Sequence, residues 1–480
     1  MMGVSLMADD LCTLGIFELA RLYREKQISP VEVVEDHLRR CDRLNPVLNA
    51  FLVIVRDSAM EAARAAESLF RAGVDLGPLQ GVPVSVKDII RVRGTRTTAA
   101  SRVLLEEDLD QEDAVVVRRL RAAGAILIGK TNLHEFATGD PDPAGPFGLV
   151  QNPRLVGYHP GSSSSGAGAA AAAGLGVIAI GTDTGGSVRI PAYLCGVSGL
   201  KPTTGRIDLE GIIPLSWTLD TVGPLACRVK DVGAAWAVCA GRPIGGMELT
   251  YPGTAKFLEN LDRSIRGWRL GFPARGFLRP LQSSVSEAYE STLRALEDLG
   301  CQLMDFDPPG LGEMPDLTMV ITQAEGSAYH ERYRHRDHLY HAAFRDRVFP
   351  GREMKALEYL SARRRQLGLQ NEWEKATRGF DALIMPSGPA VAPPHGADKL
   401  EIQGQSFPIR AMLSRFTRPA SLLGWPALSV PNGMSKEGLP TGVQFVGPPD
   451  SEERLLTLGH RLEEALGWVK KFPVEPRFPG

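Results

Sequence analysis

The sequence contains few cysteines, carries almost no net charge and has no hydrophobic run long enough for a membrane span. Its 6 cysteines are scattered over 480 residues without a CxxC pair, which argues against a disulfide framework and favours free thiols in a reducing cytosol. A formal net charge of -2 gives no support for nucleic acid or an anionic membrane as the main partner. The longest apolar stretch, residues 167–181, is mostly alanine and glycine and is shorter than a bilayer-spanning helix.

The first residues include Asp9 and Asp10 and lack the basic and apolar regions of a signal peptide. We therefore expect a cytoplasmic protein with a small-molecule substrate and with neither a membrane nor a nucleic-acid partner. The sequence leaves open whether it is a monomer or a homodimer.

The alternation of strand and helix patterns predicts an α/β fold. Valines alternate in "GVPVSVKDII", which predicts a strand ending near Lys87, and residues 114–131 read as a helix, a stop at Gly124 and a second strand. We expect a single domain over residues 1–480, with a mixed twisted β-sheet core surrounded by α-helices. Its expected parts are a helical layer (13–70), the main core segment with its glycine- and serine-rich motifs (71–240), a variable helical region beside the substrate pocket (245–375) and the C-terminal part of the core (376–480).

Helix-start signals are clear in the N-terminal layer. Ser29 precedes Pro30, and Glu32 stands where a capping box needs it. A second helix is expected from a cap at Asp57 to a stop at Gly73.

A serine follows two glycines in "GTDTGGSVRIP", residues 181–191. A turn without Cβ atoms lets backbone N–H groups approach a ligand, and consecutive N–H groups can hold an anion. The N–H groups of Thr184, Gly185, Gly186 and Ser187 beside the Ser187 hydroxyl would suit acyl transfer, in which negative charge develops on a carbonyl oxygen. From these residues alone, a tight turn in which Ser187 caps a helix is an equally good interpretation.

Longer motifs decide between the two. The chain contains, in order, "GVPVSVKDII", "PGSSSSGAG", "GTDTGGSVRIP", "CGVSGLKPT", "LDTVGPLA" and "GLPTGVQFVG". On these motifs the sequence resembles the amidase signature family over nearly its whole length. The resemblance implies that Ser187 is the nucleophile, Ser163 an intermediate serine held in a cis peptide with Ser162, and Lys87 the base, with no cofactor and no metal.

The implied chemistry requires an uncharged lysine. A serine hydroxyl needs a base to become a nucleophile, whereas a lysine with its ordinary pKa of ~10.4 is protonated at neutral pH. Burial lowers a lysine pKa, and Val84, Val86, Ile89 and Ile90 around Lys87 are compatible with burial. Local sequence alone would instead favour a surface ion pair between Lys87 and Asp88.

The chain departs from the family pattern at a few positions. Gly161 is followed by four serines, so that Ser162 and Ser165 stand where relatives usually have glycine. Ser421 replaces a frequent asparagine, and Asp183 and Arg189 are expected to buttress the turn. The candidate substrate-pocket residues are Gly161, Ser162, Phe147, Leu149 and Trp425, with residues 140–148 as a rim or lid.

Two other chemistries find little support. His330, His335, His338 and His341 stand in a helical pattern, but no carboxylate or cysteine at ligand spacing accompanies them, so we expect no metal site. No GxSxG nucleophile elbow occurs.

The expected activity is hydrolysis of an amide through an acyl-enzyme, with carbamates (urethanes) and esters as further substrates of the same site. Two alternatives remain: the amidase (glutaminase) subunit of a tRNA-dependent amidotransferase, and a non-catalytic binding relative.

Overall fold

The fold was obtained as a computed structural model. It describes residues 11–107, 111–138, 143, 145–241, 258–273 and 278–479. Within them, no helix combines the length and the apolar character that crossing a membrane demands.

One large sheet organises the described chain. Its 11 strands run in the order β1-β3-β2-β4-β6-β5-β12-β13-β9-β7-β8. The strands are β1 (Phe51–Ile54), β2 (Pro83–Lys87), β3 (Ile126–Thr131), β4 (Ile178–Asp183), β5 (Ser198–Lys201), β6 (Thr221–Ala226), β7 (Arg269–Pro273), β8 (Gln302–Phe306), β9 (Ala382–Pro386), β12 (Ala427–Met434) and β13 (Pro440–Val446). A separate hairpin pairs β10 (Lys399–Ile402) with β11 (Gln405–Pro408).

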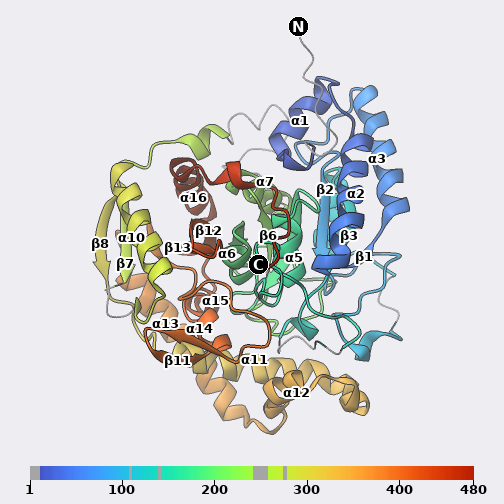
Figure 1. Cartoon of the computed structure of the whole chain (residues 1–480). Helices are drawn as coiled ribbons and strands as arrows, with labels where there is room; N and C mark the ends of the chain where they lie inside the picture. The colour runs from blue at the N-terminus through green and yellow to red at the C-terminus, as the bar shows by residue number, and fades with distance from the viewer. Residues whose placement is uncertain are drawn as a thin grey trace.

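The sheet is mixed, as the sequence predicted. β2 lies parallel to both β3 and β4, and β7 lies parallel to β8 and β9, whereas β12 pairs antiparallel with β5 and β13. Figure 1 shows the N-terminal strands at one side of the sheet and β7 and β8 at the other. Strands from residues 51 to 446 therefore share one continuous sheet.

Helices cover both faces. They are α1 (Ile16–Arg24), α2 (Pro30–Leu48), α3 (Arg56–Arg71), α4 (Val115–Ala122), α5 (Ser165–Ala172), α6 (Arg189–Cys195), α7 (Val229–Ala240), α10 (Ser283–Asp298), α11 (Met314–His330), α12 (Ala342–Val348), α13 (Ala356–Ala376), α14 (Ile409–Leu413), α15 (Arg418–Leu423) and α16 (Glu452–Leu466).

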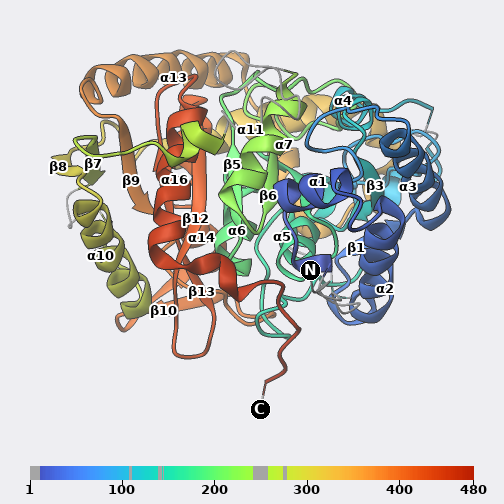
Figure 2. The same ribbon diagram turned by 90° about the horizontal axis from the view of Figure 1, so that it is seen from above.

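Alternation along β4 shows how the faces differ. Ile178 and Ile180 pack in the large core that includes α7 and α16, while Ala179 packs in a smaller core with α5 and α6. Because successive strand residues point to opposite faces, α5 and α6 lie across the sheet from α7 and α16. Figure 2 shows α7 and α16 over the central strands.

Two expectations about elements need correction. The N-terminal layer is not wholly helical, since β1 lies between α2 and α3 and pairs with β3. The region 245–375 likewise supplies β7 and β8 to the main sheet. Both regions contribute short strands, and a short strand between helices gives little periodic signal.

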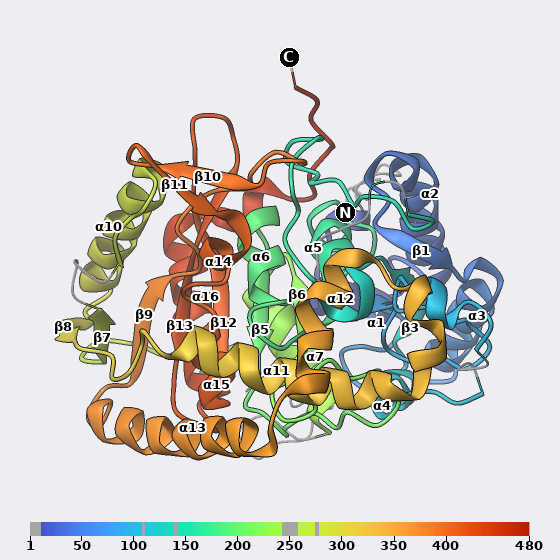
Figure 3. The ribbon, with the colours of Figure 1, turned by 90° about the horizontal axis from the view of Figure 1, so that it is seen from below.

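The predicted helix signals fared unequally. Ser29 caps α2 through a capping box with Glu32, as expected. The third helix begins at Arg56 after Val55, so Asp57 lies in its first turn and is not the cap. Beyond the core, α11, α12 and α13 lie along one side of the molecule (Figure 3).

Candidate active site

The site is built at one edge of the sheet, where β2 and β4 end. The two strands are parallel neighbours, with Val86 opposite Ile180. Lys87 and Thr182, one and two residues further on, therefore leave the sheet at the same edge. Side chains from the carboxyl ends of adjacent parallel strands meet in this way in many α/β proteins.

Lys87 lies beside Ser163 and away from solvent. Its Nζ is 2.8 Å from Ser163 Oγ and 2.8 Å from Thr182 Oγ1, and the side chain is 0% exposed. The predicted alternative, an ion pair with Asp88, does not form in the described structure: Asp88 Oδ1 pairs with Lys130 Nζ at 2.6 Å.

Burial sets the charge of this amine. Burial lowers the pKa of Lys87 to about 7, against a smaller opposite effect of the buried Asp220 and Asp183 carboxylates. An amine with this pKa is half neutral at pH 7, and so can accept a proton there.

Ser163 is held by the backbone on both sides. The peptide between Ser162 and Ser163 is cis, as the family resemblance implied. The Ser163 carbonyl accepts the N–H of His134 at 3.2 Å. The next residue, Ser164, donates its N–H to the Ser187 carbonyl at 3.3 Å, which joins the segment before α5 to the glycine turn after β4.

The turn around Ser187 is organised by Asp183. Its carboxylate accepts the N–H of Gly186 at 2.7 Å and that of Val188 at 3.3 Å. The N–H of Gly186 thus points to Asp183, and the expected role of Gly186 as an oxyanion donor is wrong. The described hydrogen bonds give no acceptor to the N–H groups of Thr184, Gly185 and Ser187.

Arg189 and Ser421 complete the support of the turn. Arg189 pairs with Asp183 at 3.0 Å, and both side chains are 0% exposed. Burial raises the pKa of Asp183, but Arg189 outweighs it and holds that pKa below its usual value. Ser421 Oγ accepts from Arg189 Nη2 at 2.8 Å and lies 3.2 Å from Asp183 Oδ1, so the serine that the sequence left unexplained belongs to this buried network.

Ser163 and the half-buried Ser187 open into one small cavity of about 90 Å³. Ser162, Thr184 and Gly185 also line it. The remaining lining residues come from later elements or from the loop after β3 and include His134, Thr318, Thr322, Arg347, Arg410 and Arg418.

Other predicted pocket residues lie elsewhere. Trp425 is 2% exposed and packs against Trp373 in the core. Gly161 is buried against α6, where a Cβ on it would lie 2.5 Å from Pro191 Cα, and it does not line the cavity. Leu149 is half-buried, and its carbonyl accepts from Asn49. Of the expected rim, residues 140–142 and 144 lie outside the described residues.

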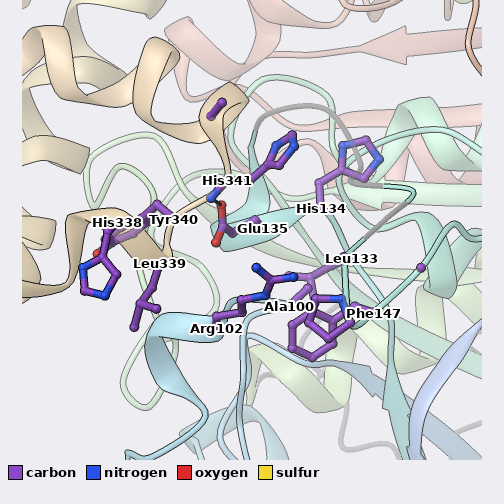
Figure 4. Close-up of a pocket in the computed structure, with 14 residues that line it drawn as sticks. Ala100, Arg102, Leu133, His134, Glu135, Phe147, His338, Leu339, Tyr340 and His341 are labelled. Carbon is purple, nitrogen blue, oxygen red and sulfur yellow. Dashed lines mark hydrogen bonds between the residues drawn. The ribbon is translucent and has the colours of Figure 1, made fainter.

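Phe147 lines a neighbouring cavity of about 170 Å³ (Figure 4). His134 lines both cavities, which places them next to each other. Glu135 in this second cavity is already engaged, since it accepts from Ser101 Oγ at 2.6 Å and from the N–H of His341 at 3.0 Å.

The four histidines do not share a helix face. His330 ends α11 and is buried with its Nδ1 2.8 Å from Tyr340 Oη, whereas His335 and His338 lie in a kinked 3-10 segment, Glu331–Leu339. Within the described residues, the one group with metal-ligand spacing is Asp262, His460 and Glu464, and it is remote from these histidines in sequence.

Sequence reasoning missed three contributors to the site. Thr182 is the second partner of Lys87. Asp220 accepts from Thr184 Oγ1 at 2.5 Å, and burial raises the pKa of Asp220 to about 6. Both stand inside the quoted motifs, so the motifs gave a signal; Arg418, which also lines the cavity, lies in no such motif.

Comparison with known proteins agrees with this geometry. The profile of the Amidase family matches residues 32–456. One subunit of the glutamyl-tRNA(Gln) amidotransferase of Hahella chejuensis is 35% identical over 486 residues, covering 96% of this chain and 98% of that protein. The subunit of the same name from Alkaliphilus metalliredigens is 32% identical over 494 residues, covering 96% and 98%.

Solved structures show the same fold. One described as an amidase has a TM-score of 0.86 at 33% identity and covers 95% of this chain and 100% of its own. A 6-aminohexanoate cyclic dimer hydrolase has a TM-score of 0.83 at 28% identity, covering 96% and 99%. Since the family profile and these relatives extend along nearly the whole sequence, this chain belongs to the amidase family and is a hydrolase of carbon–nitrogen bonds other than peptide bonds.

Proposed function

We propose that the protein hydrolyses a small-molecule amide through an acyl-enzyme, with Ser187 as nucleophile, Ser163 as proton relay and Lys87 as base. The observation that carries this proposal is the buried Lys87 Nζ, 2.8 Å from Ser163 Oγ in the cavity that Ser187 shares. A neutral amine has one lone pair and two N–H groups. It can therefore accept from Ser163 while it donates to Thr182.

The first half-reaction begins when Ser187 Oγ attacks the amide carbon. The Ser187 proton moves to Ser163 while the Ser163 proton moves to Lys87. Among the described contacts no hydrogen bond joins the two hydroxyls, so Ser187 must approach Ser163 when substrate binds; such contacts are often loose without substrate. The N–H groups of Thr184, Gly185 and Ser187 are the candidate donors to the carbonyl oxygen, which gains negative charge.

The same protons then return. Lys87, now an ammonium, gives a proton back through Ser163 to the leaving nitrogen, and the amine or ammonia departs. Water attacks the acyl-enzyme with Lys87 again as base through Ser163, and the acid is released as Ser187 regains its proton. Carbamates and esters present a comparable carbonyl to Ser187, and we include them as substrates of the same site.

The competing function is that of an amidotransferase component. The relatives that are glutamyl-tRNA(Gln) amidotransferase subunits favour it, whereas the solved structures include a 6-aminohexanoate cyclic dimer hydrolase and a peptide amidase from Stenotrophomonas maltophilia. We favour an independent hydrolase because the described lining of the cavity offers no carboxylate to the ammonium group of glutamine.

The purified chain by itself should release ammonia or amine from simple amides, and a fluorophosphonate should label Ser187. Ser187→Ala should abolish both, while Ser165→Ala, which changes a buried serine outside the proposed triad, should retain labelling. Turnover restricted to glutamine, and only with added partner subunits, would favour the amidotransferase. Absence of labelling with intact fold would favour a non-catalytic relative.

A further inference from the structure

Arg418 is a buried arginine at the proposed active site. It opens α15 and is only 9% exposed, yet it lines the cavity that contains Ser163 and Ser187. Its Cγ is 4.0 Å from the position a Cβ would take on Gly185, which puts the side chain against the turn that carries the nucleophile.

The backbone around Arg418 is fixed to that turn. The preceding residue, Thr417, donates its hydroxyl to the Gly185 carbonyl at 2.8 Å. The Thr417 carbonyl in turn accepts from Arg189 Nη1 at 2.8 Å. Arg418 is therefore positioned by the same network that positions Ser187.

The Arg418 guanidinium has no described hydrogen-bond or ion-pair partner, in contrast to Arg189 nearby. Burial lowers its pKa, and the exposed Asp316, with which it forms no described ion pair, offsets only part of this effect. A buried guanidinium without a partner is costly, and most buried charges in proteins are paired. This cation faces a cavity, so a ligand can supply the missing partner.

The charge of the cavity points the same way. Arg347 and Arg410 also line it, and the described lining residues include neither aspartate nor glutamate. Arg410 has a described partner, the Thr138 hydroxyl at 2.8 Å, but it still adds positive charge. An anion gains from all three arginines, whereas a substrate cation finds no carboxylate in this lining.

We propose that Arg418 binds a carboxylate on the substrate, so that the preferred substrates are short amides with a carboxylate a few bonds from the scissile carbonyl. The proposal rests on the proposed amide hydrolysis at Ser187. Guanidinium groups suit carboxylates because two parallel N–H donors match the two oxygens. The small cavity volume, about 90 Å³, keeps the two substrate groups close together.

This substrate class differs from free glutamine. Glutamine carries a carboxylate but also an ammonium group, and no carboxylate among the described lining residues would bind the ammonium. Half-amides of dicarboxylic acids carry the anion without the cation. Such a substrate has to come from a reaction that amidates one end of a dicarboxylate or opens a cyclic imide.

The test compares succinamate with butyramide, in which a methyl group replaces the carboxylate. Ammonia release should give a kcat/KM ratio of about 30 or more in favour of succinamate, the size expected for a buried charge pair. Arg418→Met should bring the ratio close to one, and Arg418→Lys should give an intermediate ratio. Arg415→Met, which removes a neighbouring arginine outside this cavity, should leave the wild-type ratio.

Binding separates this inference from the proposed reaction. Isothermal titration of Ser187→Ala with succinate should show binding that butyrate does not, and that Ser187→Ala/Arg418→Met loses. Equal turnover of both amides by the wild type, or an unchanged ratio in Arg418→Met, overturns the role of Arg418 while hydrolysis stands. If neither amide is turned over, the reaction proposal fails, and the succinate titration then decides whether Arg418 binds a carboxylate. A matched thermal melt of the Arg418→Met and Arg415→Met variants verifies that both remain folded.

Discussion

Lowering the pH should switch the enzyme off through a single amine. Burial places the pKa of Lys87 at about 7, and only the neutral amine can take the proton from Ser163. The neutral fraction is then about 90% at pH 8 and about 1% at pH 5. We expect kcat/KM for an uncharged amide to fall nearly a hundredfold between these pH values.

The sign follows from the identity of the base. A lysine with lowered pKa loses its proton as pH rises through 7, so activity must rise with pH and reach a plateau by about pH 8.5. A solvent-exposed lysine with pKa ~10.4 would instead give a tenfold increase per pH unit up to about pH 10. Holding the amine neutral at pH 7 corresponds to about 5 kcal/mol of destabilisation of its charged form.

The assay is a pH series of kcat/KM with butyramide, which has no titrating group of its own. Lys201 is the control, since burial also lowers its pKa to about 7, but its Nζ donates to the Pro202 and Trp425 carbonyls at 2.9 Å and does not line the cavity. Lys201→Met should keep the pH dependence, and Lys87→Met should abolish turnover. A profile still rising above pH 9, or one unchanged between pH 5 and 8, would refute the reasoning.

Three further predictions concern the support of the site. Ser421→Ala removes a hydroxyl from the buried Asp183–Arg189 pair and should lower the free energy of unfolding by about 1–3 kcal/mol, measured as a shift in thermal unfolding; an unchanged Tm would contradict it. Gly161→Ala places a methyl group 2.5 Å from Pro191 Cα at a φ of +96°, so we expect at least a tenfold loss of kcat/KM, on the order of 1.4 kcal/mol; Gly157→Ala, at φ +89° with nothing within 4 Å, should retain activity, and equal losses would count against a steric cause. Ser162→Gly removes a side chain that lines the cavity and should raise kcat/KM for bulky amides relative to small ones, as a substrate series would show.

Local patterns in the sequence were enough for the α/β class and for the residues of the proposed site. The alternating valines before Lys87 and the capping box at Ser29 depend on neighbouring residues, and such patterns can be read directly from the chain. The motifs around Ser163 and Ser187 likewise stand as continuous stretches. The triad was therefore identifiable from the sequence, although its roles remain a proposal.

The contacts of these residues depend on how distant segments pack, which local patterns do not specify. The neutral Lys87 depends on burial by strands distant in sequence, and the loss of Gly186 as a donor depends on where Asp183 points. Trp425 was misplaced in the prediction because an aromatic side chain suits a core as well as a pocket. Arg418 lies 231 residues after Ser187 in the chain, and no pattern of neighbouring residues shows that the folded sheet will bring that charge to the nucleophile without a described partner.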